Sequence, residues 1–210
     1  MSDNVTEVGH PLVRHKLGLL RDIGTDTQRF RQLVNELTLL LTYEATKELA
    51  IEEIEVETPL ERTTASRISG KKVAVCPILR AGMGMVDGVL SLIPVARVGF
   101  IGLYRNEETL EPVEYYIKLP EDLAERDAIV LDPMLATGNS SVAAIASVKS
   151  AGARSVTLVC LVAEPPGIER VHDEHPDAHI VCAAIDRALN ERGFIVPGLG
   201  DAGDRLYGTK

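Results

Sequence analysis

The sequence predicts an α/β fold in which a mostly parallel sheet is flanked by helices. From Lys71 onward, short runs rich in β-branched residues alternate with helix-like stretches, which is typical of parallel sheets. Several of these runs are apolar on successive residues, as expected for strands that are covered on both faces. The expected strands are KVAVCPIL, VARVGFIGLY, AIVLD, SVTLVCLV and HIVCAAI, and the expected helices lie at about 84–93, 139–151 and 165–174.

Before this alternation begins, the chain predicts two N-terminal helices. In the second, apolar residues recur at spacings of three and four, which is the stripe of an amphipathic helix. Thr25 or Asp26 is a suitable N-cap for its start. The stripe can pack inside the molecule or face a second subunit. Its members are Phe30, Leu33, Val34, Leu37, Leu40 and Leu41.

A further segment, EPVEYYIKLP, alternates apolar and polar residues and predicts a protruding β-hairpin arm. No internal repeat or low-complexity linker divides the 210 residues, so we expect one domain.

The composition argues against several classes of partner. With 22 Lys and Arg against 31 Asp and Glu, the formal net charge is −9. Nucleic acids and anionic membranes are bound by clustered Lys and Arg, so neither is expected as the main partner.

The three cysteines, Cys76, Cys160 and Cys182, lie in apolar runs and are predicted to be buried thiols. No signal region or membrane-length apolar run is present, and we expect a cytoplasmic protein.

The stretch AIVLDPMLATGNSS ends a buried strand in an acid and follows it with a turn rich in hydroxyls. A loop at a helix N-terminus binds anions through unpaired N–H groups, and Gly138, Thr137 and Ser140 suit that use. Asp132 would repel a phosphate, but it fits a ligand that also carries hydroxyls or a cation, as ribose 5-phosphate does. An ordinary turn with Asn139 or Ser140 as N-cap remains an alternative.

A second glycine-rich turn lies between a predicted strand and a helix. Gly82, Gly84 and Gly88 resemble a dinucleotide-binding pattern, and Arg105 at the end of the next strand suits an NADP phosphate. In the other interpretation, Arg80 and Arg105 lie on neighbouring strand ends and bind a second anionic group such as pyrophosphate.

The C-terminal stretch ERGFIVPGLGDAGDRLYGTK has too many glycines for a regular element. It reads either as a floppy end or as an ordered lid that presents backbone N–H and C=O groups to a planar ligand.

Taken together, these stretches resemble the uracil phosphoribosyltransferase family almost end to end. The N-terminal match is HPLVRHKLGLLRD and FRQLVNELTLLLTYEAT; the other matching segments are PILRAGMGMVDG, IGLYRNEETLEPVEYYIKLP, LDPMLATGNS and GFIVPGLGDAGDRLYGT. The chain departs from the family pattern at Phe100, Asn106 and Asn139, where His, Asp and Gly are usual. Asn139 in place of Gly is expected to change the flexibility of the turn that follows Asp132.

The resemblance implies a phosphoribosyltransferase-type fold and the pyrimidine-salvage reaction of uracil with 5-phosphoribosyl 1-diphosphate (PRPP) to give UMP and pyrophosphate. It also implies Mg2+, a possible GTP activator and a homodimer or homotetramer. The expected single domain, 1–210, then has an N-terminal helical and hood region to about 70, a core sheet over about 71–185, and a C-terminal uracil-binding hood over about 186–210.

The resemblance also assigns residues. It implies catalytic roles for Arg80, Arg105, Asp132 and Asp201. The residues implied for PRPP are Arg80, Arg105, Asp132, Pro133, Met134, Leu135, Ala136, Thr137, Gly138, Asn139, Ser140 and Asp201. Those implied for uracil are Ile195, Gly200, Asp201 and Ala202. No residue is expected to hold Mg2+ directly, because it arrives on the pyrophosphate, with Asp201 reaching it through water. The rival classes are an NADP-dependent oxidoreductase and a pyrimidine-sensing RNA-binding regulator, the latter requiring a basic face.

Overall fold

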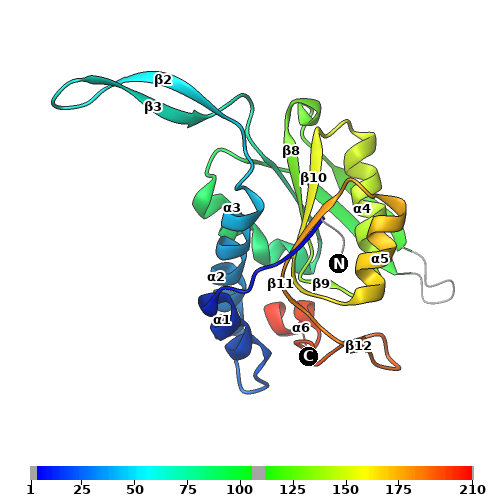
Figure 1. Cartoon of the computed structure of the whole chain (residues 1–210). Helices are drawn as coiled ribbons and strands as arrows, with labels where there is room; N and C mark the ends of the chain where they lie inside the picture. The colour runs from blue at the N-terminus through cyan, green and yellow to red at the C-terminus, as the bar shows by residue number, and fades with distance from the viewer. Residues whose placement is uncertain (1–3, 106–111, 210) are drawn as a thin grey trace.

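The computed structural model describes residues 4–105 and 112–209. Their centre is a nine-stranded sheet in the order β1-β11-β10-β8-β4-β6-β7, with β5 beside β4 and β9 beside β10 (Figure 1). All of its pairs are parallel except β6 with β7. The bounds are β1 Val5–Glu7, β4 Ala74–Leu79, β5 Arg97–Val98, β6 Phe100–Arg105, β7 Pro112–Lys118, β8 Asp127–Leu131, β9 Met134–Leu135, β10 Ser155–Ala163 and β11 His179–Ile185.

Helices lie on both faces of this sheet, so the expected α/β fold is confirmed (Figure 1). Each face has its own cluster of buried hydrophobic residues. On one face lie α1 (Pro11–Arg21), α2 (Thr27–Ala45) and α3 (Val86–Leu92); on the other lie α4 (Asn139–Ser150) and α5 (Pro165–Glu174). The short 3-10 helices are η1 (Ala81–Met85) and η2 (Leu123–Glu125).

Most of the expected elements are present, with local changes. The run VARVGFIGLY is split at Gly99 into β5 and β6, and the helix expected at 84–93 starts at Val86 because η1 precedes it. The three cysteines are free and buried in strands, as expected.

The stripe on α2 packs inside the molecule. Asp26 is the N-cap, and its Oδ1 accepts a hydrogen bond from the backbone N–H of Arg29 at 2.8 Å. Leu40 is half-buried, and the other members have no exposed surface. The cluster on this face also contains residues of α1, α3, β10 and β11. The stripe therefore secures α2 to the sheet.

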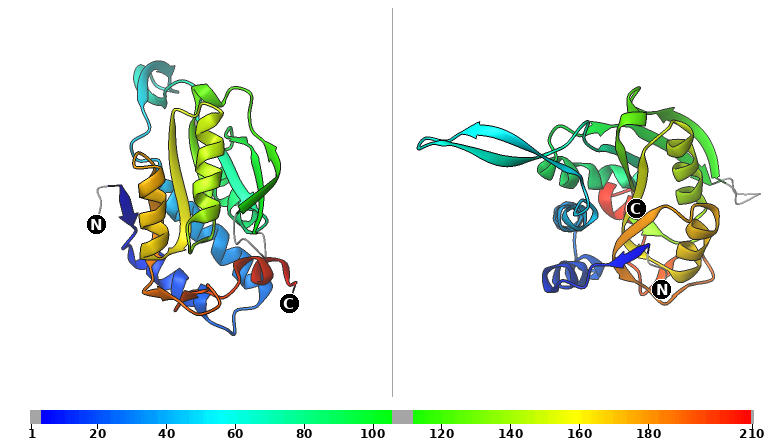
Figure 2. Two further views of the ribbon diagram at one scale, coloured as in Figure 1. Left: turned by 90° about the vertical axis from the view of Figure 1, so that its right-hand side faces the viewer. Right: turned by 45° about the horizontal axis from the view of Figure 1, so that its top comes forward.

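The segment EPVEYYIKLP forms one strand of a hairpin, as expected, and the connection at residues 106–111 lies outside the described residues. Residues 112–118 of EPVEYYIKLP form β7, which is the antiparallel edge strand of the main sheet beside β6. A different pair, β2 (Ile51–Glu57) and β3 (Arg62–Ile68), forms a separate two-stranded sheet that extends away from the body (Figure 2). The region expected to be helical up to about residue 70 thus ends in this hairpin.

The C-terminal segment is ordered, which rules out the floppy end. Residues 186–209, here called the hood, contain β12 (Ala188–Leu189), β13 (Ile195–Val196) and α6 (Ala202–Tyr207). The guanidinium of Arg21 donates to both carboxylate oxygens of Asp186 at 2.7 Å and to the carbonyl of Gly198 at 2.6 Å. Arg205 donates to the carbonyls of Leu20 at 2.8 Å and Asp22 at 2.7 Å. Side chains from both ends of the chain therefore fix the hood to α1 and the turn after it.

Candidate active site

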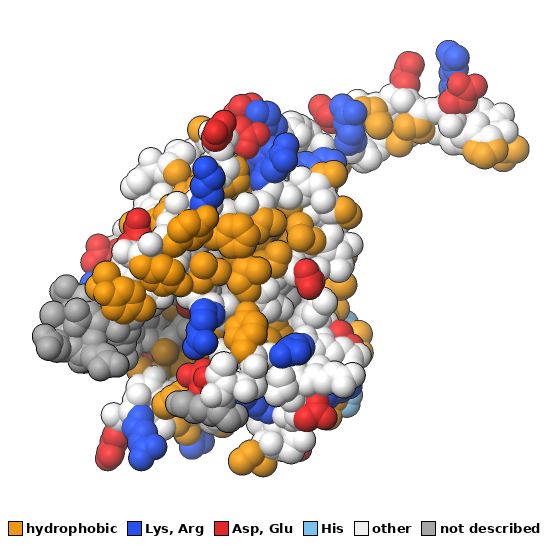
Figure 3. Space-filling view, turned by 180° about the vertical axis from the view of Figure 1, so that it is seen from behind, with side chains coloured by type: hydrophobic (Ala, Val, Ile, Leu, Met, Phe, Trp, Pro, Cys, Tyr) orange, Lys and Arg blue, Asp and Glu red, His pale blue; other side chains and the backbone are white. Residues whose placement is uncertain are grey.

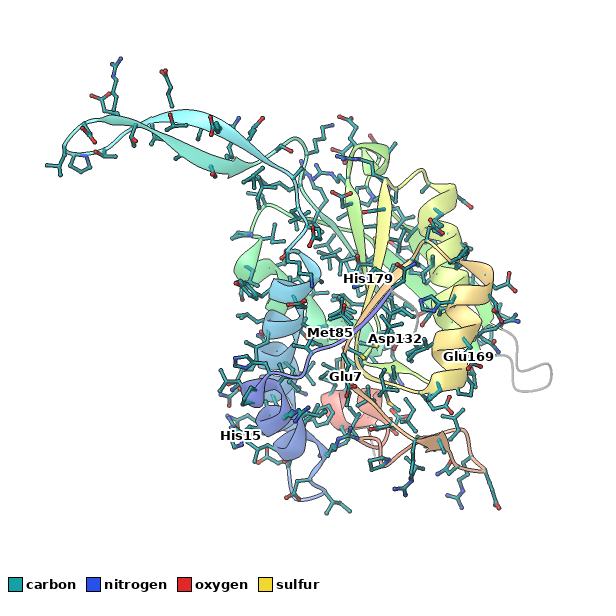
Figure 4. All side chains as sticks on the ribbon, viewed as in Figure 1. Glu7, His15, Met85, Asp132, Glu169 and His179 are labelled. Carbon is teal, nitrogen blue, oxygen red and sulfur yellow. The ribbon has the colours of Figure 1, made fainter. Side chains whose placement is uncertain are left out.

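The candidate site is built at the carboxyl edge of the sheet. In the parallel register, Pro77 on β4 and Val159 on β10 both lie opposite Leu131, the last residue of β8. Asp132 follows directly at this edge, as Figure 4 shows. Ligands of open parallel sheets bind beyond this edge. The loops that follow β4 and β8 are therefore adjacent here.

Asp132 is partly buried, and its carboxylate has one protein donor. Its Oδ1 accepts a hydrogen bond from the backbone N–H of Met134 at 3.3 Å. Burial raises the pKa of this carboxyl to about 6, against the lowering effect of the Met134 hydrogen bond. A ligand that donates hydrogen bonds to this carboxylate would stabilise its ionised form.

Residues 135–140, here called the phosphate loop, connect β9 to α4. Gly138 is the N-cap of α4, with φ +81 and no side-chain capping bond, so the alternative in which Asn139 or Ser140 caps the helix is wrong. Within the described chain, the backbone N–H groups of residues 136–140 have no backbone acceptor. A row of unpaired donors at a helix N-terminus is an anion site.

The glycines after β4 allow close packing. A Cβ atom on Gly82 would lie 2.3 Å from the carbonyl oxygen of Leu131, and one on Gly88 would lie 2.8 Å from the carbonyl oxygen of Asn35. A Cβ atom on Gly84 would lie 2.7 Å from the side chain of Leu206. The spacing is thus explained by contacts of η1 with β8 and the hood and of α3 with α2, and needs no dinucleotide.

Arg80 lies in this turn, between β4 and η1. It is exposed, and in the described part of the chain its guanidinium has no carboxylate partner within salt-bridge distance. Arg105 is the last residue of β6, the strand beside β4, but its side chain lies outside the described residues, as does Asn106. The backbone therefore places both arginines at the ends of adjacent strands.

The hood closes the site from the η1 side. The hydroxyl of Tyr207 donates to the carbonyl of Arg80 at 2.9 Å. Burial raises the pKa of Tyr207, and the nearby Arg80 opposes that shift. A Cβ atom on Gly203 would lie 4.0 Å from the Cβ of Ala81. The start of α6 is therefore in contact with the turn that carries Arg80.

The residues expected to contact uracil are presented by hood backbone. Ile195 and Ala202 are buried, and Gly200 is exposed with φ +78. Asp201 is the N-cap of α6, and its Oδ1 accepts a hydrogen bond from the N–H of Asp204 at 2.9 Å. One of the two carboxylate oxygens of Asp201 thus has a structural partner.

The sequence analysis missed the residues that hold the hood in place. Arg21, Asp186 and Arg205 each make a hydrogen bond to a segment more than 160 positions away in the chain. Within the hood, Asp186 also accepts from the N–H of Gly198, and Arg205 also donates to the carbonyl of Leu199. The local pattern around each of the three is ordinary. Their role follows only from the folded arrangement.

The described residues contain no group of three or more His, Cys, Asp and Glu side chains arranged to hold a metal ion. Of the helices in the described chain, none combines the length and apolar character that a membrane crossing requires.

Comparisons with known proteins show the family of this chain. The family model described as uracil phosphoribosyltransferase matches residues 7–209. A uracil phosphoribosyltransferase of Clostridium botulinum (strain Hall) is 59% identical over 206 residues, which are 98% of this chain and 99% of the relative.

Two solved structures are similar to this chain to different degrees. The AQ2163 protein from Aquifex aeolicus has a TM-score of 0.93 and 38% identity, covering 98% of this chain and 99% of that one. Adenine phosphoribosyltransferase from Trypanosoma brucei, with a TM-score of 0.58 and 10% identity over 88% of this chain and 85% of that one, shares the fold alone. The family model and the identity across almost the whole chain lead to one conclusion: this chain belongs to the uracil phosphoribosyltransferase family.

Proposed function

We propose that this chain transfers the 5-phosphoribosyl group of PRPP to uracil, giving UMP and pyrophosphate, and so salvages pyrimidines. The observation that carries the proposal is the meeting of Asp132, the phosphate loop and the hood backbone at one edge of the sheet. A ligand with an anion, sugar hydroxyls and a planar base fits these three parts. Family membership agrees with it.

The phosphate loop binds the 5-phosphate, and Asp132 binds the ribose. The unpaired N–H groups of residues 136–140 and the hydroxyls of Thr137 and Ser140 donate to the phosphate oxygens. The carboxylate of Asp132 accepts from the 2- and 3-hydroxyls. Pro133 and Met134 connect the two parts and contact the same ligand.

Arg80 and Arg105 bind the pyrophosphate. In the transfer, the bond from ribose C1 to the pyrophosphate oxygen breaks and its electron pair leaves with the pyrophosphate. The bond from C1 to uracil N1 forms, and N1 loses its proton. Negative charge grows on the leaving group, so a guanidinium placed there stabilises the transition state. The protein also orients the base toward C1.

The hood recognises uracil through its backbone. Ile195, Gly200 and Ala202 present main-chain N–H and C=O groups to the edge of the base. The lack of a side chain on Gly200 lets the backbone approach closely. Asp201, the N-cap of α6, lies between Gly200 and Ala202 in the sequence and is assigned to both uracil and PRPP.

Mg2+ would reach the site on the substrate, because this ion is commonly bound through one or two carboxylates together with substrate phosphates. Asp201 would contact the ion through water. Bound Mg2+ offsets charge on the leaving pyrophosphate.

Pyrophosphate release measured with PRPP and Mg2+ tests the activity. We expect release with uracil and none with cytosine, orotate, hypoxanthine or no base. Each reaction run with and without GTP would show whether that nucleotide activates the enzyme. Release with hypoxanthine and not with uracil, or no release with any base, would contradict the proposed function.

Replacing Arg80 tests the pyrophosphate assignment. Arg80→Ala should lower turnover by about 10²–10³, by analogy with removal of one oxyanion donor. Arg97→Ala is the matched control, because Arg97 is also exposed but lies opposite Ala74, at the other end of β4. Equal activity of the two variants in steady-state assays would remove Arg80 from the site.

The pH dependence of kcat/KM for PRPP tests Asp132. The ionised carboxylate accepts the ribose hydroxyls, and its pKa in the free protein is raised to about 6. The value of kcat/KM should therefore fall as the pH drops through 6, by roughly tenfold per pH unit below it. The Asp132→Asn variant should have low activity, and its kcat/KM should not fall as the pH drops through 6.

The same pKa shift predicts a stability effect. Because the folded-state pKa of Asp132 is raised to about 6, the unfolded chain ionises first, and stability is lost as the pH rises from the ordinary pKa of a carboxyl to about 6 and then stays constant. At pH 8, Asp132→Asn should raise the free energy of unfolding by about 1–3 kcal/mol. Denaturant melts that show a large loss at pH 8 would make Asp132 a structural residue.

The chain functions as a homodimer or homotetramer. The hairpin β2–β3 pairs only with itself in the described chain, and an isolated hairpin is marginally stable in water. On the face seen in Figure 3, hydrophobic side chains gather beside the base of that hairpin. Exposed residues such as Leu92, Tyr104 and Tyr116 suit an interface. Sedimentation at micromolar concentration should give a multiple of 22.7 kDa; a single 22.7 kDa species would refute this.

A further inference from the structure

The first turn of α5 is in direct contact with the phosphate loop. The backbone N–H of Glu164, the N-cap of α5, donates to the carbonyl of Leu135 at 3.0 Å. A Cβ atom on Gly167 would lie 2.1 Å from the carbonyl oxygen of Ala136 and 3.0 Å from that of Leu135. From the other side, a Cβ on Gly138 would lie 2.9 Å from the carbonyl oxygen of Gly167. The two backbones thus touch with no side chain between them.

This contact determines which way two N–H groups of the loop point. A peptide unit is planar and trans, so its N–H points opposite to its C=O. The carbonyl of Leu135 is directed at Glu164, so the N–H of Ala136 points away from α5. The carbonyl of Ala136 lies against Gly167, so the N–H of Thr137 also points away from α5. Neither N–H has a backbone acceptor in the described chain, which leaves both free for a ligand.

The turn is suited to act as a fixed support. Pro165 and Pro166 occupy its first two helical positions, and their rings lock φ near the helical value. Gly167 follows inside the helix, where glycine is less favourable than alanine. It is absent from the positive-φ glycines, so backbone conformation does not explain it. The close approach of Ala136 does.

We propose that Gly167 is a positioning residue: it lets α5 hold the carbonyls of Leu135 and Ala136 so that the N–H groups of Ala136 and Thr137 are aimed at the 5-phosphate of PRPP. This inference rests on the proposed function, because it concerns the same loop. It adds that the affinity of the loop for phosphate depends on a helix outside the loop.

Gly167→Ala tests the proposal. The added Cβ must displace the carbonyl of Ala136 and turn both peptide units. Calorimetry with ribose 5-phosphate, which carries the 5-phosphate and the hydroxyls, should show about 10- to 100-fold weaker binding, the worth of one charge-assisted hydrogen bond. Inorganic pyrophosphate should bind as before. In assays, KM for PRPP should rise by a similar factor while KM for uracil stays within about twofold, because the hood is unchanged.

Two glycine variants serve as matched controls. In Gly88→Ala, the new Cβ lies 2.8 Å from the carbonyl oxygen of Asn35 and from the Cβ of Thr38, so it crowds α2 against α3, away from the loop. This variant should have a lower Tm but an unchanged affinity for ribose 5-phosphate. Gly18→Ala adds a Cβ with nothing within 4 Å and should change neither quantity.

The outcomes separate this inference from the proposed function. Suppose that the wild type releases pyrophosphate with uracil. If Gly167→Ala then binds ribose 5-phosphate as tightly as the wild type does, Gly167 does not position the loop. The same conclusion holds if the variant loses affinity for ribose 5-phosphate and for pyrophosphate to the same extent. If the wild type is inactive, the proposed function fails instead. Should the variant not fold, amide spectra of the wild type decide: ribose 5-phosphate should shift the N–H signals of Ala136 and Thr137, and unmoved signals would overturn the inference.

Discussion

The candidate site depends on the parallel register of β4, β8 and β10. Since these strands run in the same direction, the loops that follow β4 and β8 leave the sheet at one edge. The contact of Gly82 with the carbonyl of Leu131 then brings the turn that carries Arg80 against the start of the loop that carries Asp132. A side chain at position 82 would separate these two turns, and a single PRPP molecule could not span both in the proposed way.

The hood adds a second constraint, and polar contacts hold it in place. Asp186 is 6% exposed, and its charge is balanced by a two-bond contact with Arg21. Removing one partner of such a buried pair leaves an uncompensated charge, whereas the intact pair fixes geometry more than it adds stability. Arg205 extends this by donating to carbonyls at the end of α1 and in the turn after it, and its guanidinium lies 4.3 Å from the centre of the Phe30 ring. A backbone that recognises a base through its N–H and C=O groups must have a fixed position, and these contacts fix the position of the hood.

Local sequence was enough to predict the main elements and the position of the phosphate loop. The apolar runs have the length and composition of covered strands, and the stripe of α2 has helical spacing. The change from a buried strand to an acid and then to hydroxyls marked Asp132. The assignment of individual residues to PRPP and uracil came from family resemblance and stays a proposal, and the side chain of Arg105 lies outside the described residues.

What the sequence could not predict has physical reasons. Strand β2 reads IEEIEVE, whose glutamates are poor strand formers and whose apolar positions are few, so neither propensity nor burial marked the hairpin. The Arg21–Asp186 pair spans 165 positions, and no local pattern encodes such a contact. Gly167 lies in an ordinary helical stretch, and only the distance to Ala136 shows why it is glycine.

The most direct test of the account is a crystal structure of this chain with UMP bound. The account predicts the 5-phosphate on the backbone N–H groups of residues 136–140, the ribose hydroxyls on Asp132, and the base against the backbone of Ile195, Gly200 and Ala202. A UMP molecule whose phosphate lies away from the phosphate loop, or whose base does not touch the hood, would contradict it.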